Sequence, residues 1–127
     1  MAGMKALFIG LFLALPFLFF IAPTTVQAQT TLTSTGAGIP QFDTNLTAAG
    51  NPHVVEADVF IRSGSLSFGP GVVIKFKSGA SLEAHADVQI TSTATDAEPV
   101  YFTSYQDDSV GGDTNGDGNA TAPAPGD

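Results

Sequence analysis

The chain has 127 residues, with 4 Lys and Arg against 12 Asp and Glu, no Cys, and a formal net charge of -8. Nucleic-acid backbones are bound through clustered Lys and Arg, so this acidic balance excludes a nucleic-acid partner. The lack of Cys excludes disulfides and thiol chemistry. The length leaves room for one domain at most.

Residues 1–28 have the features of a secretory signal peptide. Lys5 gives a positive start, residues 6–22 are almost wholly apolar, and small residues lead up to an expected cleavage site after Ala28. A retained membrane anchor is the disfavoured alternative, because the apolar run is near the lower length limit for spanning and Pro16 interrupts it. We therefore predict a secreted or cell-surface protein that meets a membrane only through its transient signal peptide.

Residues 29–50 are rich in Thr, Ser, Ala and Gly, with only isolated apolar residues. Such a composition suits a flexible leader. It also suits an N-terminal cap that shields the first turn of a stacked structure. The sequence leaves these two interpretations open.

Residues 51–104 alternate between apolar and polar side chains, which is the period of β-strands. Val59 and Ile61 alternate with Phe60, for example, and the glycines between such runs suit corners of the chain. We expect nine apolar residues to face one interior: Leu66, Val72, Ile74, Phe76, Leu82, Val88, Ile90, Val100 and Phe102. Four polar residues are expected on exposed faces: Lys75, Lys77, Glu83 and His85.

Part of this pattern occurs twice, at a fixed offset of 16 positions. The offset relates Leu66 to Leu82, Val72 to Val88, and Ile74 to Ile90. Strands this short cannot each bury a face alone, so copies at a fixed offset predict that each turn of chain stacks on the one before it. A β-sandwich of antiparallel strands remains the rival interpretation.

The wording of the stretch from Phe68 to Phe76, with Gly-Pro-Gly between two apolar runs, resembles the parallel β-helix proteins that bacteria secrete or display. The strand-like run at residues 99–104, followed by an Asp- and Gly-rich segment, is similar to the same pectate-lyase-like and adhesin-like group. The resemblance covers roughly residues 51–127. It implies an all-β fold, a right-handed parallel β-helix (solenoid) that is incomplete at its C-terminal end, and it specifies architecture better than activity.

Residues 105–127 form an acidic, Gly-rich segment with one sharp local motif. Asp113, Asn115 and Asp117 stand two positions apart and Gly118 follows at once, as in the first half of a calcium-binding loop. The twelfth position holds Ala124 in place of the bidentate Glu, so the segment is not an EF-hand. The rival interpretation is a disordered acidic linker.

Calcium is the cofactor that this motif suggests, because it takes six to eight hard oxygen ligands. Two further aspartates could fold back to supply the missing carboxylates. The predicted metal ligands are Asp107, Asp108, Asp113, Asn115 and Asp117. We expect residues 105–127 to lead into further strands, and the chain to be truncated.

Catalytic candidates are few in this chain. Its 2 histidines include His53, which stands beside Pro52 and is expected to be a turn residue and not a general base. No Ser stands in a nucleophile elbow, and no pair of His has metal-ligand spacing. The sequence therefore offers no catalytic residue, and the question of an enzyme stays open with the balance against it.

Two functions remain after these exclusions. The first is a β-helix scaffold, secreted or held at the cell surface, with an adhesive or structural role and a surface polysaccharide or other cell-surface ligand as its partner. The alternative is the N-terminal part of a β-helix lyase or hydrolase that acts on polysaccharides, in which a long groove holds an extended sugar.

Overall fold

The computed structural model describes residues 29–32 and 42–127, so the predicted signal peptide lies outside the described residues. Nearly every regular element in these two ranges is a short β-strand, and none is an α-helix; one 3-10 turn, η1 (Ala48–Gly50), is also present. The strands are β1 (Thr30–Leu32), β2 (Phe42–Leu46), β3 (His53–Val55), β4 (Val59–Ile61), β5 (Gly64–Phe68), β6 (Val73–Phe76), β7 (Leu82–Ala84), β8 (Val88–Ser92) and β9 (Tyr101–Ser104). The expected all-β class is confirmed.

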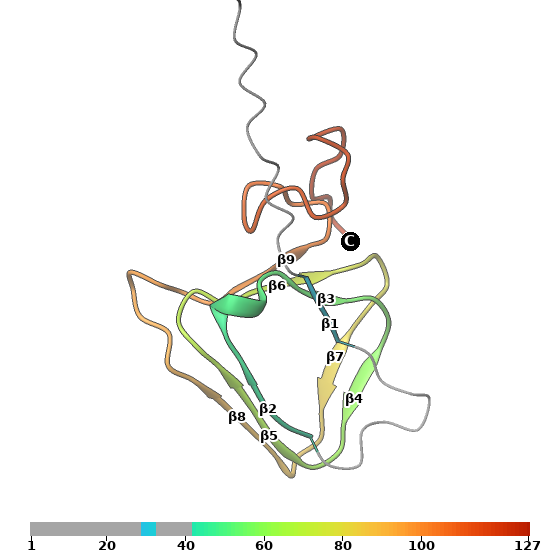
Figure 1. Cartoon of the computed structure of the whole chain (residues 1–127). Helices are drawn as coiled ribbons and strands as arrows, with labels where there is room; N and C mark the ends of the chain where they lie inside the picture. Colours follow the sequence, from blue (N-terminus) through green and yellow to red (C-terminus); the bar gives the residue numbers. More distant parts are fainter. Residues whose placement is uncertain (1–28, 33–41) are drawn as a thin grey trace, which may run out of the picture.

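The strands form three sheets in which every pairing is parallel. Their orders are β1-β3-β6-β9, β2-β5-β8 and β4-β7. From β3 onward the chain visits the three sheets in one repeating order, and Figure 1 shows the sheets as three sides around a common interior. The antiparallel sandwich is therefore wrong for the described residues, because its neighbouring strands would run in opposite directions.

Strand register corrects the predicted 16-residue offset. Leu66 pairs with Ile90, whereas Leu82 pairs with Val59 in a different sheet. Stacked partners are 21 positions apart between His53 and Ile74, and 28 apart between Val73 and Tyr101. The predicted offset is wrong because strands on every side of the structure have the same apolar alternation. A similar sequence pattern therefore does not reveal which strands are neighbours.

The leader contributes to these sheets. β1 pairs with β3 and β2 pairs with β5, so parallel pairing begins upstream of Asn51, where the first strands were expected. Leu46, at the end of β2, is 3% exposed and packs in the core. The segment between these two strands, residues 33–41, is outside the described ranges.

The core is built from the inward side chains of successive strands. It consists of Leu46, Val55, Val59, Ile61, Leu66, Phe68, Val72 and Ile74, with Phe76, Leu82, Val88 and Val100 packed against it. Full burial of one such aliphatic side chain contributes about 1.5–3 kcal/mol. The expected corners are also present, since Gly71 and Gly79 have φ of 67° and 77°, a region that glycine enters without strain.

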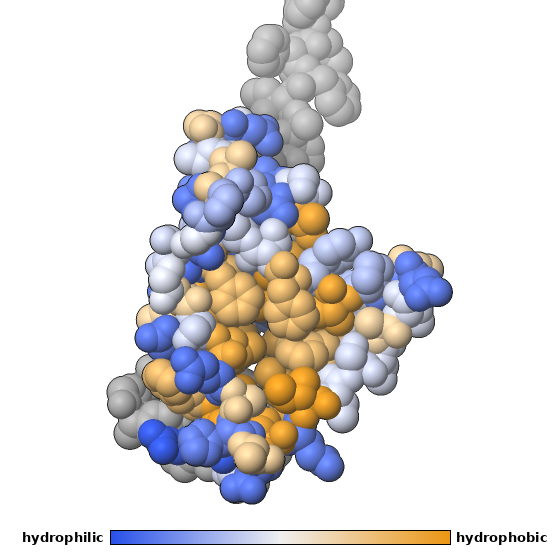
Figure 2. All heavy atoms as spheres, turned by 180° about the vertical axis from the view of Figure 1, so that it is seen from behind, coloured by the Kyte–Doolittle hydropathy of each residue, from blue (hydrophilic) through white to orange (hydrophobic). Residues whose placement is uncertain are grey.

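Two residues expected in the interior are exposed instead. Ile90 and Phe102 are 58% and 56% exposed, although their register partners Leu66 and Ile74 are buried. They thus stand at inward positions of the last strands, and no described strand stacks on them. Figure 2 shows apolar side chains gathered on this face. The ring of Phe102 packs edge-to-face with the ring of Phe68, and the two ring centres are 5.4 Å apart. We name Ile90, Phe102 and the outer edges of β7, β8 and β9 the open end.

Candidate metal-binding loop

The loop of residues 105–127 follows β9 and folds back over the outer face of β6. Lys75 on β6 is the anchor, because its Nζ donates hydrogen bonds to the carbonyl oxygens of Asp107 and Gly112, both at 2.7 Å. Lys75 is fully buried, which corrects the prediction of an exposed lysine. The alternating pattern correctly predicted that this side chain points away from the core. A loop more than thirty positions later in the chain covers it.

The surroundings of Lys75 act on its charge in two directions. Burial lowers the pKa of Lys75 below its usual value, and the nearby carboxylates of Asp108, Asp107 and Asp113 partly oppose that effect. An ammonium group that leaves water needs such acceptors and counter-charges. The loop's carboxylates and carbonyl oxygens thus offset part of the free-energy cost of burying the Lys75 ammonium group.

The other three polar residues that were predicted to be exposed are Lys77, Glu83 and His85. Glu83 and His85 are exposed, as predicted. Lys77 is partly exposed and forms an ion pair with Glu56 at 2.5 Å, and its Nζ lies 5.1 Å from the centre of the Tyr105 ring. The hydrogen bond to Glu56 is the main reason that the pKa of Lys77 is raised.

Asp107 is used for the loop's own structure. Its carboxylate accepts hydrogen bonds from Thr103 Oγ1 at 2.5 Å, from the Ser109 amide at 3.0 Å and from Ser109 Oγ at 2.5 Å. These bonds, above all the one from the Ser109 side chain, lower the pKa of Asp107. These bonds tie Asp107 to β9 and to the first turn of the loop.

Asp113 shapes the predicted calcium motif. One carboxylate oxygen accepts from the amides of Gly116 at 2.7 Å and Asp117 at 3.1 Å, and the other accepts from Gly118 at 3.0 Å. Asn115 closes the same turn, because its amide nitrogen donates to Asp117 Oδ2 and its amide oxygen accepts from the Asp117 amide. The motif is therefore a compact turn, and the Asn115 side chain is engaged within it.

Asp117 receives the most hydrogen bonds of the motif's side chains. Its carboxylate accepts from the amides of Ala120 and Thr121, from Thr121 Oγ1 and from Asn115 Nδ2. The bond from the Thr121 side chain is the main reason that the pKa of Asp117 is lowered. The carboxylate is thus held in its charged form.

Asp108 differs from its three acidic neighbours. Both of its carboxylate oxygens are shut off from solvent, and neither accepts a hydrogen bond. One oxygen each of Asp108, Asp113 and Asp117 lie within 4.8 Å of one another, a set that we name the carboxylate cluster. Of the five predicted ligands, the structure brings these three together. Asn115 lies beside them through its hydrogen bond to Asp117 Oδ2, and Asp107 stands outside the set.

A hollow of about 530 Å³ adjoins the cluster. Its lining includes Asp108 from the first part of the loop, and Asn119 and Pro123 from the last part. It is open to the surface and lies between the start and the end of the loop. The hollow gives a small solute a way to approach this part of the chain.

Several supporting residues were not foreseen from the sequence. Lys75, Thr103 and Thr121 hold the loop through contacts described above. Ser109 could have been found, because a Ser two positions after an Asp is a common local turn. Lys75 carried no such signal, since its partners are distant in sequence.

The histidines show no catalytic arrangement. His53 lies in β3 and is 3% exposed, so the prediction of a turn residue is wrong; the strand begins one residue after Pro52. Its Nε2 donates to the Thr47 carbonyl oxygen at 2.9 Å, while its Nδ1 has no partner. A carbonyl can only accept, so Nε2 carries the proton. His53 is a buried core histidine.

No protein-family model, curated protein or solved structure matches the chain. In the part of the chain that the structure describes, no helix is long and apolar enough to cross a membrane.

Proposed function

We propose that the chain belongs to an exported parallel β-helix scaffold with an adhesive or structural role. The observation that supports this most is the regular passage of parallel strands through three sheets in one order, with apolar side chains in register. This order is what a β-helix requires, since each turn of chain must cover the one before it. The resemblance to secreted and surface-displayed β-helix proteins agrees with it.

The outer surface suits a binding role better than a catalytic one. Ser67 on β5 bonds to Asn45 on the neighbouring β2 at 2.9 Å, and Gln89 and Thr91 continue this polar face on β8. Rows of hydroxyl and amide groups on a flat parallel sheet can hydrogen-bond to an extended sugar chain. A surface polysaccharide or another cell-surface ligand is the partner that we propose.

The alternative is part of a β-helix enzyme that acts on polysaccharides. A lyase of this kind would need a basic side chain free to take a proton from the sugar, whereas a hydrolase would use a pair of carboxyl groups. Lys75 is the basic residue nearest the carboxylate cluster, but its ammonium group is buried and donates to two carbonyl oxygens. This placement disfavours a lyase that uses Lys75 as its base.

Export is tested by expressing the 127-residue sequence in a bacterial host with a C-terminal tag. We expect tagged protein outside the cytoplasm, with Gln29 as its first residue by mass spectrometry. An intact chain that stays in the cytoplasm would contradict the proposed export.

Polysaccharide binding is tested by co-sedimentation of the exported protein with a panel of insoluble polysaccharides. The double variant Gln89→Ala plus Thr91→Ala should bind at least threefold more weakly, because it removes hydrogen-bonding groups from the polar face. Glu83→Ala, at an exposed position on β7 in a different sheet, is the control. If the protein sediments with none of the polysaccharides, a polysaccharide is not its partner. If the polysaccharides release unsaturated or reducing sugar ends, the enzyme alternative is favoured.

A further inference from the structure

We propose that the carboxylate cluster of Asp108, Asp113 and Asp117 binds one calcium ion, and that the bound ion fastens the loop to the outer face of the β6 and β9 sheet. This inference is independent of the proposed scaffold function. It rests on the loop's own atoms and on the way that Lys75 ties the loop to β6.

The first observation is that the carboxylate of Asp108 accepts no hydrogen bond, although the Lys75 ammonium lies near enough to interact with its charge. A buried ionised carboxylate without a hydrogen bond is costly, and such groups are normally paired or bound to a metal. Both oxygens of Asp108 are closed to solvent and accept no bond, yet one of them lies within 4.8 Å of carboxylate oxygens from Asp113 and Asp117. A cation at this point supplies the partner that Asp108 lacks.

Distance favours calcium as that cation. Calcium binds oxygen at about 2.3–2.6 Å, so two ligands on opposite sides of the ion are about 5 Å apart. Three oxygens that lie within 4.8 Å of one another can therefore share one calcium without a large movement. Magnesium demands a near-ideal octahedron and gives up its water reluctantly, so a site that needs three protein carboxylates as ligands suits it less well.

Charge points the same way. The carboxylates of Asp108, Asp107 and Asp113 lie close enough to the Lys75 ammonium to oppose part of the lowering of its pKa by burial, and Asp117 adds a further negative charge beside them. One ammonium cannot balance four carboxylates, and Lys75 is already bonded to two carbonyl oxygens. A divalent cation would remove most of the remaining repulsion.

Hydrogen bonds hold the cluster residues Asp113 and Asp117, and also Asp107 next to the cluster, in fixed positions. Asp113 and Asp117 accept hydrogen bonds through both carboxylate oxygens, which fixes their orientation, and one oxygen of each also lies in the cluster. Asp107 stands outside the cluster, and its bonds to Thr103 and Ser109 hold the loop on β9. The site is thus linked to β6 through Lys75 and to β9 through Thr103, and binding should stabilise the whole chain by mass action.

The test is a calcium titration of the protein recovered after expression of the full 127-residue sequence. We expect the amide signals of Gly112, Gly116 and Gly118 to shift with a dissociation constant of about 0.1 to 1 mM, the range of extracellular calcium modules. Saturating calcium should also raise the thermal midpoint by several degrees. The same concentration of magnesium should have at most a tenth of the effect.

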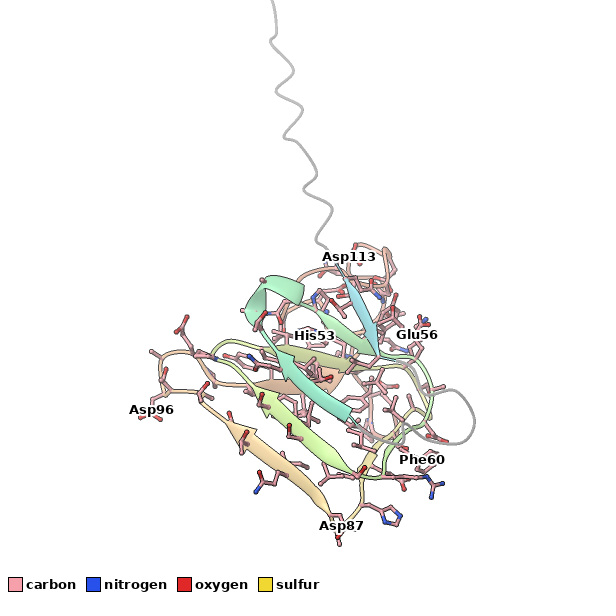
Figure 3. The ribbon with its side chains drawn as sticks, turned by 60° about the horizontal axis from the view of Figure 1, so that its bottom comes forward. His53, Glu56, Phe60, Asp87, Asp96 and Asp113 are labelled. Atoms are coloured by element: carbon pink, nitrogen blue, oxygen red, sulfur yellow. The ribbon has the colours of Figure 1, made fainter. Side chains whose placement is uncertain are left out.

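Asp108→Asn is the decisive variant, because it keeps the shape of the side chain and removes its charge. Calcium affinity should fall at least tenfold, whereas the control Asp96→Asn, an equal change of charge on a corner far from Asp113, should bind as the unchanged protein does (Figure 3). If Asp108→Asn does not fold, as judged by circular dichroism, Asp113→Asn at an exposed position takes its place with the same expectation.

Three results would overturn the proposal. They are no response at calcium concentrations up to ten times the expected dissociation constant, an equal response in the Asp108→Asn and Asp96→Asn variants, and an equal response to magnesium. A tenfold loss in Asp108→Asn with the calcium preference retained in Asp96→Asn would support it.

Discussion

Gly111 shows how tightly the loop is pressed against the sheet. Its φ is 71°, and a Cβ built on it would stand 3.1 Å from Val73 Cγ1 and 3.5 Å from Lys75 Cε. Glycine is therefore needed twice, once for the backbone angle and once for the close approach. This single position determines how near the loop can come to Lys75.

Gly111→Ala should destabilise the chain by about 2 kcal/mol, because the left-handed conformation costs a non-glycine residue roughly 1–2 kcal/mol and the new methyl group must also push Val73 aside. Gly79→Ala is the matched control. Its φ is 77°, but nothing lies within 4 Å of the added Cβ, so only the backbone cost remains. Urea unfolding followed by circular dichroism measures both variants. Equal losses would mean that the loop does not pack closely on Val73.

Alternation along single strands could be predicted from the sequence, because it depends on neighbouring residues alone. Val59 and Ile61 point inward and Phe60 points outward, as expected. Which strand stacks on which could not be predicted, because the pairing of Leu66 with Ile90 depends on corner lengths that vary from one turn to the next. An alternating pattern predicts the face of a side chain but not its neighbour.

For the candidate site as well, the features that depend on neighbouring residues could be predicted, and the long-range contacts could not. The spacing of Asp113 and Asp117 indicated the motif, since its residues are close in sequence. The choice of Asp108 over Asp107 could not be made, because it depends on whether Thr103 and Ser109 reach one carboxylate or the other. The role of Lys75 was missed for the same reason: a covering loop is a long-range contact.

Leu66 and Ile90 allow the contribution of stacking to be measured at one register position. Leu66 is 1% exposed between β2 and β8, whereas Ile90 on β8 is 58% exposed. Leu66→Ala should therefore cost about 2–5 kcal/mol, the range for deleting a buried aliphatic side chain. Ile90→Ala should cost at most about 1 kcal/mol, as expected near a surface, at protein concentrations low enough to keep the chain monomeric. Urea unfolding gives both values, and similar losses would show that something covers Ile90 in solution.

At the scale of the whole molecule, the described strands end in a surface unlike the rest. β7, β8 and β9 each have one edge without a described partner, and these edges surround the exposed Ile90 and Phe102. Unpaired parallel edges around an apolar surface favour pairing with another chain. Stacked turns also become stable only when about three or more share a core, so the chain alone should have low stability.

We therefore expect the purified chain to associate through its open end. Sedimentation should show a mass that rises with protein concentration, and the thermal midpoint should rise with it. Ile90→Lys should return the chain to a monomer, because a charged side chain on the open end opposes burial by a second copy. Phe60→Lys is the control, since Phe60 is 39% exposed but points outward from β4, on the side of the structure (Figure 3). It should associate as the unchanged protein does. A monomer with a sharp transition that does not depend on concentration would contradict this prediction, and loss of association in Phe60→Lys alone would place the contact on the side of the molecule.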